Sequence, residues 1–175
     1  MINPSHARSL VRAGIGKIYH EMSWKEVTKC PDLSHPDYSE IREGIGISFV
    51  GVPSNNLNTL FYLYARDMHL SGVGCRVVRL ATLIRSVGKQ AEIVSDWMEI
   101  PALFIDGFFL DNPYKEGPFR PYEMLAGEEL IRDRISCGRP VFVKANQGIL
   151  ECASWWTPDI LQLIAKKTVT IKVLP

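Results

Sequence analysis

The chain has 175 residues, of which 46% are hydrophobic and 22% charged. This length and composition are typical of one globular domain and exclude disordered and fibrous classes. The formal net charge of +1 gives no global attraction to nucleic acid, so any DNA contact must come from a local patch. The scattered cysteines show no metal-site spacing, and no apolar run reaches a membrane-spanning length of about 18 residues. We therefore expect a cytoplasmic protein with no metal site and no membrane partner.

A loop rich in proline, aspartate and serine, residues 30–44, separates a short N-terminal segment from the rest of the chain. In that segment Ser23 and the glutamate three residues later have capping-box spacing, which predicts a short helix starting at Trp24. The predicted organisation is a helical or extended segment over residues 1–44 and one domain over residues 45–175.

Beyond this loop, short apolar runs alternate with segments of helical periodicity. The predicted strands cover residues 45–50, 75–80, 102–106, 140–145 and 168–173. The predicted helices cover residues 57–70, 82–87, 121 to about 137, and 158–167. This alternation predicts a three-layer α/β/α domain with a five-stranded, mostly parallel sheet. Ligands of such sheets bind beyond the carboxyl ends of the strands.

The loop GVPSNNLNT joins the first predicted strand to a helix, where a phosphate-binding loop of the form GxxxxGK[ST] would lie. Gly51 and Pro53 fit this pattern. The second glycine, the lysine and the hydroxyl residue are replaced by Asn56, Leu57 and Asn58. No lysine occurs in the loop or the helix after it, which weakens triphosphate binding by roughly one to two decades. The helix N-terminus still attracts anions, so we expect no cofactor beyond weakly bound ATP and magnesium.

Two later strand ends carry polar residues of the same kind of site. Asp106 ends the third predicted strand, where an aspartate would coordinate magnesium, and Gly107 replaces the acid that would polarise water. Asn146 follows the fourth strand, at the place of a γ-phosphate sensor. The alternatives are an aspartate that caps a loop and a turn-forming asparagine. The vestigial nucleotide site predicted here comprises Gly51, Pro53, Ser54, Asn55, Asn56, Asn58, Thr59, Asp106 and Asn146.

In order and spacing, these features resemble AAA+ helicase loaders of the DnaC/DnaI type and the related IstB transposition ATPases. RAGIGKIYHEMSW is similar to the lead-in of the loaders, and GEELIRDRISCGRPVFVKAN to their helix, turn and fourth strand. The resemblance runs from Arg12 over nearly the full chain and implies an AAA+-like P-loop NTPase fold. These proteins extend an arginine into a neighbouring subunit's nucleotide, yet no arginine follows Arg139 here. We also expect no helical lid domain.

Two groups of residues are candidates for binding macromolecules. Single-stranded DNA binding needs cationic side chains along a groove, and the alternative for each basic residue is a solvated face. The predicted DNA-binding residues are Arg76, Arg79, Arg85 and Lys89, with a second set of Arg132, Arg134 and Arg139. For Arg134 we favour a structural ion pair. The predicted partner-binding residues are Ile18, Tyr19, Trp24, Trp155 and Trp156, for which core packing is the alternative.

The chain keeps the order of strands and of polar strand-end positions. It lacks the lysine and second glycine of the phosphate-binding loop, the catalytic acid and the arginine that reaches a neighbouring subunit. This combination predicts a pseudo-ATPase with no catalytic residues. We expect a replication or mobile-element protein, of phage or plasmid type, that binds a replicative helicase or another AAA+ protein and can oligomerise. Two alternatives stay open. One is an active helicase loader or transposition regulator that a partner subunit completes, and the other is a structural subunit of a larger assembly.

Overall fold

The computed structural model describes residues 3–27, 44–52, 54–87, 89, 91–109, 119, 121–146, 148 and 156–173. The strands are β1 (Gly46–Gly51), β2 (Cys75–Arg79), β3 (Ala102–Phe109), β4 (Val141–Ala145) and β5 (Thr168–Val173). The α-helices are α1 (Pro4–Arg12), α3 (Asn55–Leu70), α4 (Leu80–Val87), α5 (Ala91–Glu99), α6 (Pro121–Ser136) and α7 (Pro158–Lys167). Two short 3-10 turns, η1 (Lys17–Tyr19) and η2 (Trp24–Glu26), follow α1.

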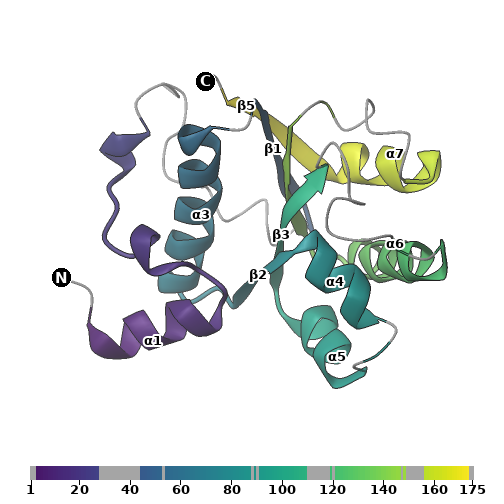
Figure 1. Ribbon diagram of the computed structural model, residues 1–175, viewed down its shortest axis with the longest axis horizontal. Helices are drawn as coiled ribbons and strands as arrows, with labels where there is room; N and C mark the ends of the chain where they lie inside the picture. Colours follow the sequence, from purple (N-terminus) through teal and green to yellow (C-terminus); the bar gives the residue numbers. More distant parts are fainter. Residues whose placement is uncertain are drawn as a thin grey trace.

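The strands form one parallel sheet in the order β2-β3-β4-β1-β5 (Figure 1). α3 and the N-terminal elements cover one face, while α4, α5, α6 and α7 cover the other. Alternate strand residues feed the two cores: Phe104 packs toward α3, and Ile105 packs toward the opposite helices. The predicted three-layer α/β fold with a five-stranded parallel sheet is thus confirmed.

Helix α3 is the central element of its face of the sheet. The Ser54 side chain caps it by accepting a hydrogen bond from the Leu57 N–H at 3.2 Å. Leu57, Leu60, Phe61, Tyr64 and Met68 are buried at helical spacing. The helix stops where Gly72 takes a φ of 86°, a left-handed conformation that favours glycine.

The N-terminal elements are packed into the domain core. Leu10 and Ile15 are at most 1% exposed and belong to the same core as α3. Between them and β2, the Ala13 carbonyl accepts a 2.7 Å hydrogen bond from the Val77 N–H. A Cβ on Gly14 would lie 2.3 Å from the Val77 carbonyl oxygen, so only glycine fits this crossing. The segment from residue 3 to residue 27 therefore shares one hydrophobic core with the sheet.

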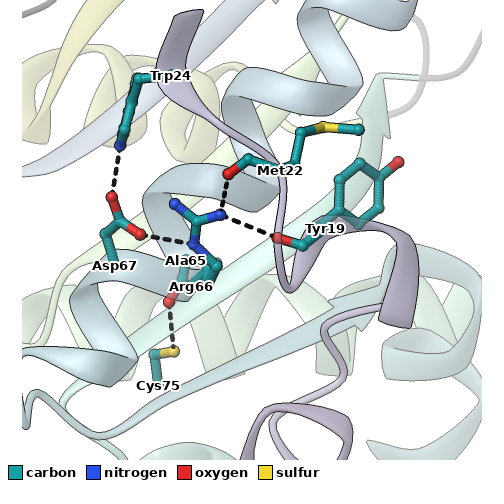
Figure 2. Close-up of polar contacts among 7 residues, drawn as sticks. All are labelled: Tyr19, Met22, Trp24, Ala65, Arg66, Asp67 and Cys75. Atoms are coloured by element: carbon teal, nitrogen blue, oxygen red, sulfur yellow. Dashed lines mark hydrogen bonds and ion pairs between the residues drawn. The ribbon is translucent and has the colours of Figure 1, made fainter. Parts of the chain in front are cut away.

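Two adjacent charged residues of α3, Arg66 and Asp67, bind the N-terminal segment to the helix (Figure 2). The Arg66 guanidinium donates to the carbonyls of Tyr19, at 3.1 Å, and Met22, and its Nε lies 2.6 Å from the Asp67 carboxylate. Asp67 in turn accepts a 2.5 Å hydrogen bond from the Trp24 indole. Backbone carbonyls shielded from water need donors, and Arg66 supplies them for these two partly buried carbonyls.

Several boundaries differ from those predicted. α1 and α5 were not predicted, and the helix expected from Trp24 is a single 3-10 turn. Leu80 begins α4 instead of ending β2, and β3 continues past Asp106 to Phe109. None of the helices in the described ranges is long and apolar enough to cross a bilayer.

Candidate functional site

A lysine and an aspartate meet at the carboxyl end of the sheet, on the face that α3 covers. Phe104 and Phe142 are paired across β3 and β4 and stack at 4.3 Å. Two positions further on, Asp106 and Lys144 point to the same face, because side chains alternate along a strand. The Lys144 Nζ lies 2.6 Å from Asp106 Oδ1, with the two side chains only 13% and 17% exposed. This is a mostly buried ion pair at the expected magnesium position.

Helix α3 supplies the remaining partners of this ion pair. The Tyr62 hydroxyl donates to Asp106 Oδ2 at 2.8 Å, so each carboxylate oxygen has an internal donor. Lys144 also donates to Asn58 Oδ1 at 2.5 Å. Its ammonium lies 5.5 Å from the ring centroid of Phe61 and 5.7 Å from that of Tyr62, within cation–π range. Lys144 thereby joins β4, β3 and the first turns of α3.

Tyr19 of η1 covers this cluster from outside. Its ring stacks on the ring of Tyr62 with centroids 4.3 Å apart and planes 6° from parallel. Burial, and then the negative charge of Asp106, raise the pKa of Tyr62, and the same two causes raise the pKa of Tyr19. The Tyr62 phenol therefore stays protonated and continues to donate to the carboxylate. The N-terminal segment is thus part of the wall of the site.

A second cation borders Asp106 on its other side. Arg79 pairs with Asp106 in the register of β2 and β3, and its side chain is exposed. The positive charge of Arg79 lowers the pKa of Tyr62. Burial and the charge of Asp106 raise the same pKa by more. The Asp106 carboxylate therefore lies on the strand between those that carry Arg79 and Lys144.

The residues of the GVPSNNLNT loop have mainly structural contacts. A Cβ on Gly51 would lie 2.4 Å from the Val173 carbonyl oxygen, so this glycine allows β5 to approach β1. Ser54 caps α3, and Leu57, at the lysine position, is 1% exposed and packed in the core. Asn55 is exposed, Asn56 is half-buried and Thr59 is buried, while Pro53 lies outside the described residues.

The position of the expected catalytic acid lies in an irregular stretch of β3. The pairing of β3 with β4 shifts between Ile105 and Phe109, and Gly107 takes a φ of 74°. A residue with a side chain is disfavoured in that conformation by about 1–2 kcal/mol. Asn146, the expected sensor, lies half-buried in a bend directly after β4.

The basic residues predicted to bind DNA lie in different environments. Arg76 donates to the Arg12 carbonyl, and the Arg85 guanidinium lies 5.5 Å from the Phe119 ring centroid. Arg79 and Lys89 are exposed. DNA binding by these residues stays a prediction.

The second basic set is divided by burial. Arg132 is exposed, whereas Arg134 is 0% exposed. The Arg134 guanidinium donates to the carbonyls of Trp97, Met98, Pro101 and Pro140, and Arg139 also donates to Met98. The prediction of an ion pair for Arg134 is therefore wrong within the described residues, because its acceptors there are backbone carbonyls and not a carboxylate.

The aromatic candidates for partner binding that the structure describes are buried or half-buried. Trp156 is 4% exposed, stacks on Phe108 at 4.4 Å and donates to its carbonyl at 3.4 Å. It is a core residue and is not accessible to a partner. Tyr19 and Trp24 are half-buried and pack against α3. Ile18 is 70% exposed. Trp155 lies outside the described residues.

Sequence reasoning missed Lys144 and Tyr62. The signal for Lys144 was the matching alternation of Phe104 with Asp106 and of Phe142 with Lys144 on neighbouring strands. In the described part of the chain, no three His, Cys, Asp or Glu side chains are grouped as metal ligands.

Known structures with the same fold include replication proteins. No family model matches the sequence, and no curated protein matches it. A crystal structure of the DnaC helicase loader is similar, with a TM-score of 0.63 and 15% identity over 98% of this chain and 92% of that one. DnaI gives a TM-score of 0.62 and 14% identity over 87% of this chain and 95% of that one. AMPPCP-bound DnaA from Aquifex aeolicus gives 0.60 and 7% identity over 73% of this chain and 39% of that one. The chain therefore has the fold of a DnaC-type AAA+ domain.

Proposed function

We propose that this protein is a replication accessory factor of the helicase-loader type that acts by binding a replicative helicase or a related AAA+ protein, without hydrolysing ATP. The observation that carries the proposal is the engagement of both Asp106 oxygens, by Lys144 and by Tyr62. The likeness to the DnaC loader along 98% of the chain supports the replication context.

The described residues do not fit a magnesium nucleotide. An aspartate that helps to hold magnesium needs a carboxylate oxygen facing the ion or its water shell. Here the Lys144 ammonium provides the positive charge that magnesium would otherwise bring to Asp106. If the Asp106 carboxylate turned toward a metal ion instead, the mostly buried ammonium would lose its partner. The lysine position of the loop is a core leucine, Leu57, and the acid position is Gly107. We therefore derive no catalytic step through ATP.

Nucleotide binding is the first test. In calorimetric titrations with ATP and magnesium, we expect an affinity about ten- to a hundredfold weaker than that of an intact phosphate-binding loop, because the lysine contact is absent. We expect no phosphate release above background. Micromolar binding together with turnover would show that the site is active and the proposal wrong.

The binding role is tested separately with the purified replicative helicase from the same source. We expect the helicase to co-elute with this protein in gel filtration, equally with and without ATP. Asp106→Asn keeps the shape of the side chain while removing its charge, so it leaves this complex unchanged under the proposal. A protein that binds single-stranded DNA and no helicase would instead be an initiator or a transposition regulator.

One contact favours a second function, an active ATPase. Lys144 reaches Asn58 in the first turn of α3, so β4 brings a lysine close to the place where the loop lacks one. If that ammonium binds phosphate, Lys144→Met and Asp106→Ala each abolish hydrolysis. Under the leading proposal, no hydrolysis is present to be lost.

A further inference from the structure

The two edges of the sheet differ in what covers them. At the β2 edge, the Val77 N–H donates to the Ala13 carbonyl at 2.7 Å, and Arg76 donates to the carbonyl of Arg12, so the N-terminal segment occupies that edge. At the opposite edge, β5 is the last strand of the sheet (Figure 1). Within the described part of the chain, β5 keeps an outer row of backbone N–H and C=O groups to which no further strand or loop is paired.

The β5 edge is regular along its full length. Its residues, Thr168–Val173, pair with Gly46–Gly51 of β1 without a shift in register. None of them is proline or glycine. An unbroken edge of this kind is a template on which another extended segment can form the same ladder of hydrogen bonds.

The two faces of β5 differ in chemistry. Val169, Ile171 and Val173 point to the α3 face of the sheet, where Val173 is buried, Ile171 is half-buried and Val169 is 47% exposed. Thr170 and Lys172 point to the other face and are exposed. The edge therefore offers apolar contacts on one face and polar, cationic contacts on the other.

Three lysines make this edge positively charged. Lys166 and Lys167 end α7 directly before β5, and Lys172 lies near the end of the strand. Among the described residues, none of the three has a salt-bridge partner. Neither β1 nor β5 contains an acid, and Asp159 of α7 lies in the first turn, at the far end of that helix. The edge therefore suits an acidic partner.

We propose that the outer edge of β5 adds a strand from a partner protein, an extended segment in which apolar residues alternate with acidic ones. The apolar side chains of this segment lie beside Val169 and Ile171, and its acidic side chains lie on the face of Lys172, because both strands alternate with a period of two. Backbone hydrogen bonds supply the affinity, and the two faces supply the specificity. The proposal does not depend on the proposed function, since β1 separates β5 from the strand of Lys144.

Two other occupants fit the edge less well. A pair of β5 edges from two copies of this chain would bring two sets of the same lysines together, and like charges across a ladder are destabilising. Lysines on an edge strand are a common means of preventing such self-pairing. Single-stranded nucleic acid is held by stacking on aromatic side chains as well as by cations, and β5 contains no aromatic residue.

A blocked, fluorescein-labelled peptide of alternating glutamate and valine, long enough to span β5, is the probe for the first test. By fluorescence anisotropy we expect it to bind the wild-type protein with a dissociation constant on the order of 0.1 mM, as for a small contact. A peptide of alternating lysine and valine is expected to bind at least about tenfold more weakly, because its charge opposes that of the edge. No binding of the acidic peptide at about 1 mM protein, or equal binding of the two peptides, would overturn the proposal.

Methylated peptides test whether the probe pairs as a strand. N-methylation removes a backbone donor, as proline does. Two versions of the acidic peptide carry N-methyl groups either on the glutamate amides or on the valine amides, which blocks one edge of the extended peptide in each. We expect at least one version to bind more than about tenfold more weakly than the parent peptide. If both bind as the parent does, charge alone holds the peptide and the proposal is wrong.

Amide hydrogen exchange locates the contact. Binding of the acidic peptide is expected to slow exchange in β5 and to leave exchange in β2 unchanged, because Ala13 already occupies the β2 edge. Slower exchange in β2 or in a helix, with β5 unchanged, would place the peptide elsewhere and contradict the proposal.

Charge reversal identifies the lysines, once circular dichroism has shown that each variant is folded. K166E/K172E is expected to bind the acidic peptide about tenfold more weakly than the wild type does, and the lysine peptide more tightly. The control R8E/R132E makes the same change in charge at exposed positions of α1 and α6, and it should bind the acidic peptide as the wild type does. An equal loss in both variants would mean that net charge and not the β5 edge attracts the peptide, and the proposal would fail.

Two further outcomes would assign the edge to another occupant. If the wild-type protein dimerises without peptide and exchange in β5 is slow only in the dimer, the occupant is a second copy of the chain. If an oligothymidylate slows exchange in β5 and the acidic peptide does not, the occupant is nucleic acid. Either result excludes the proposed partner strand.

Discussion

The Lys144 ammonium and the Asp106 carboxylate lie 2.6 Å apart on neighbouring strands, enclosed between the sheet and α3. Neither charge is well solvated, so each depends on the other. This pair links β3 to β4 at the site.

Replacing Lys144 by Met is expected to lower the free energy of unfolding by about 2–4 kcal/mol, because a mostly buried carboxylate is left without its counter-ion. Adding Asp106→Asn should recover part of this loss, and the double-mutant cycle measures the coupling. Urea unfolding gives all four values. Lys172→Met, at an exposed position of β5, is the control and should change stability by less than about 0.5 kcal/mol. Equal effects of the two lysine substitutions would contradict a structural role for the pair.

Tyr62 predicts a loss of stability in alkali. Its pKa is raised in the folded protein above the ordinary value of 10.0, so the folded state keeps the phenol proton longer than the unfolded state does. The contribution is therefore complete below about pH 10 and is lost as the pH rises above it. We expect Tyr62→Phe to flatten the decline in urea-unfolding stability above about pH 10, with Tyr19 accounting for a remaining slope in the same direction. An unchanged slope would contradict the prediction.

His69 is expected to make the protein less stable in acid. Its Nε2 shares a 2.7 Å hydrogen bond with the Ser9 hydroxyl of α1, and burial, followed by Arg76 and His6, lowers its pKa from 6.5. The unfolded chain takes up the proton first, so this stabilisation is present above about pH 6.5 and is lost as the pH falls below it. His69→Gln should show a smaller difference in melting temperature between neutral and mildly acidic buffer. A wild-type difference retained in the variant would exclude His69 as its source.

Arg134 is expected to be among the most sensitive positions in the chain. Its replacement by Met removes a donor from four backbone carbonyls, two of them in buried hydrogen bonds, and should destabilise the protein by about 3 kcal/mol or more. Arg132, two residues earlier on the same helix and exposed, is the matched control. Arg132→Met should stay within about 0.5 kcal/mol of the wild type. Thermal unfolding of both variants tests the difference.

Four of the five strands could be predicted to within one residue at each end, for a physical reason. A strand covered on both faces must be apolar along its length, and such runs stand out between glycine and proline. The polar positions near the strand ends followed from these runs, although Asp106 lies three residues before the end of β3 and does not end it. The order of these elements and of the motifs between them carried the resemblance to DnaC-type loaders, whose fold the chain shares.

Contacts between distant segments could not be predicted in the same way. α1 has only nine residues and of these buries Leu10 alone, so few apolar positions were available to indicate a helix. The role of Lys144 depends on strand register, which a single sequence does not fix, and a lysine inside a strand normally indicates an exposed edge. Trp156 was ambiguous because only the fold decides which of two adjacent aromatic residues faces the core.

The left-handed conformation at Gly107 has an evolutionary consequence. A single substitution to Asp or Glu would put a side chain where the backbone favours none, so it would introduce strain before it supplied any chemistry. That strain, about 1–2 kcal/mol, would have to be offset elsewhere in the chain. The bent strand thus ties any change toward an acid at this position to a compensating change elsewhere.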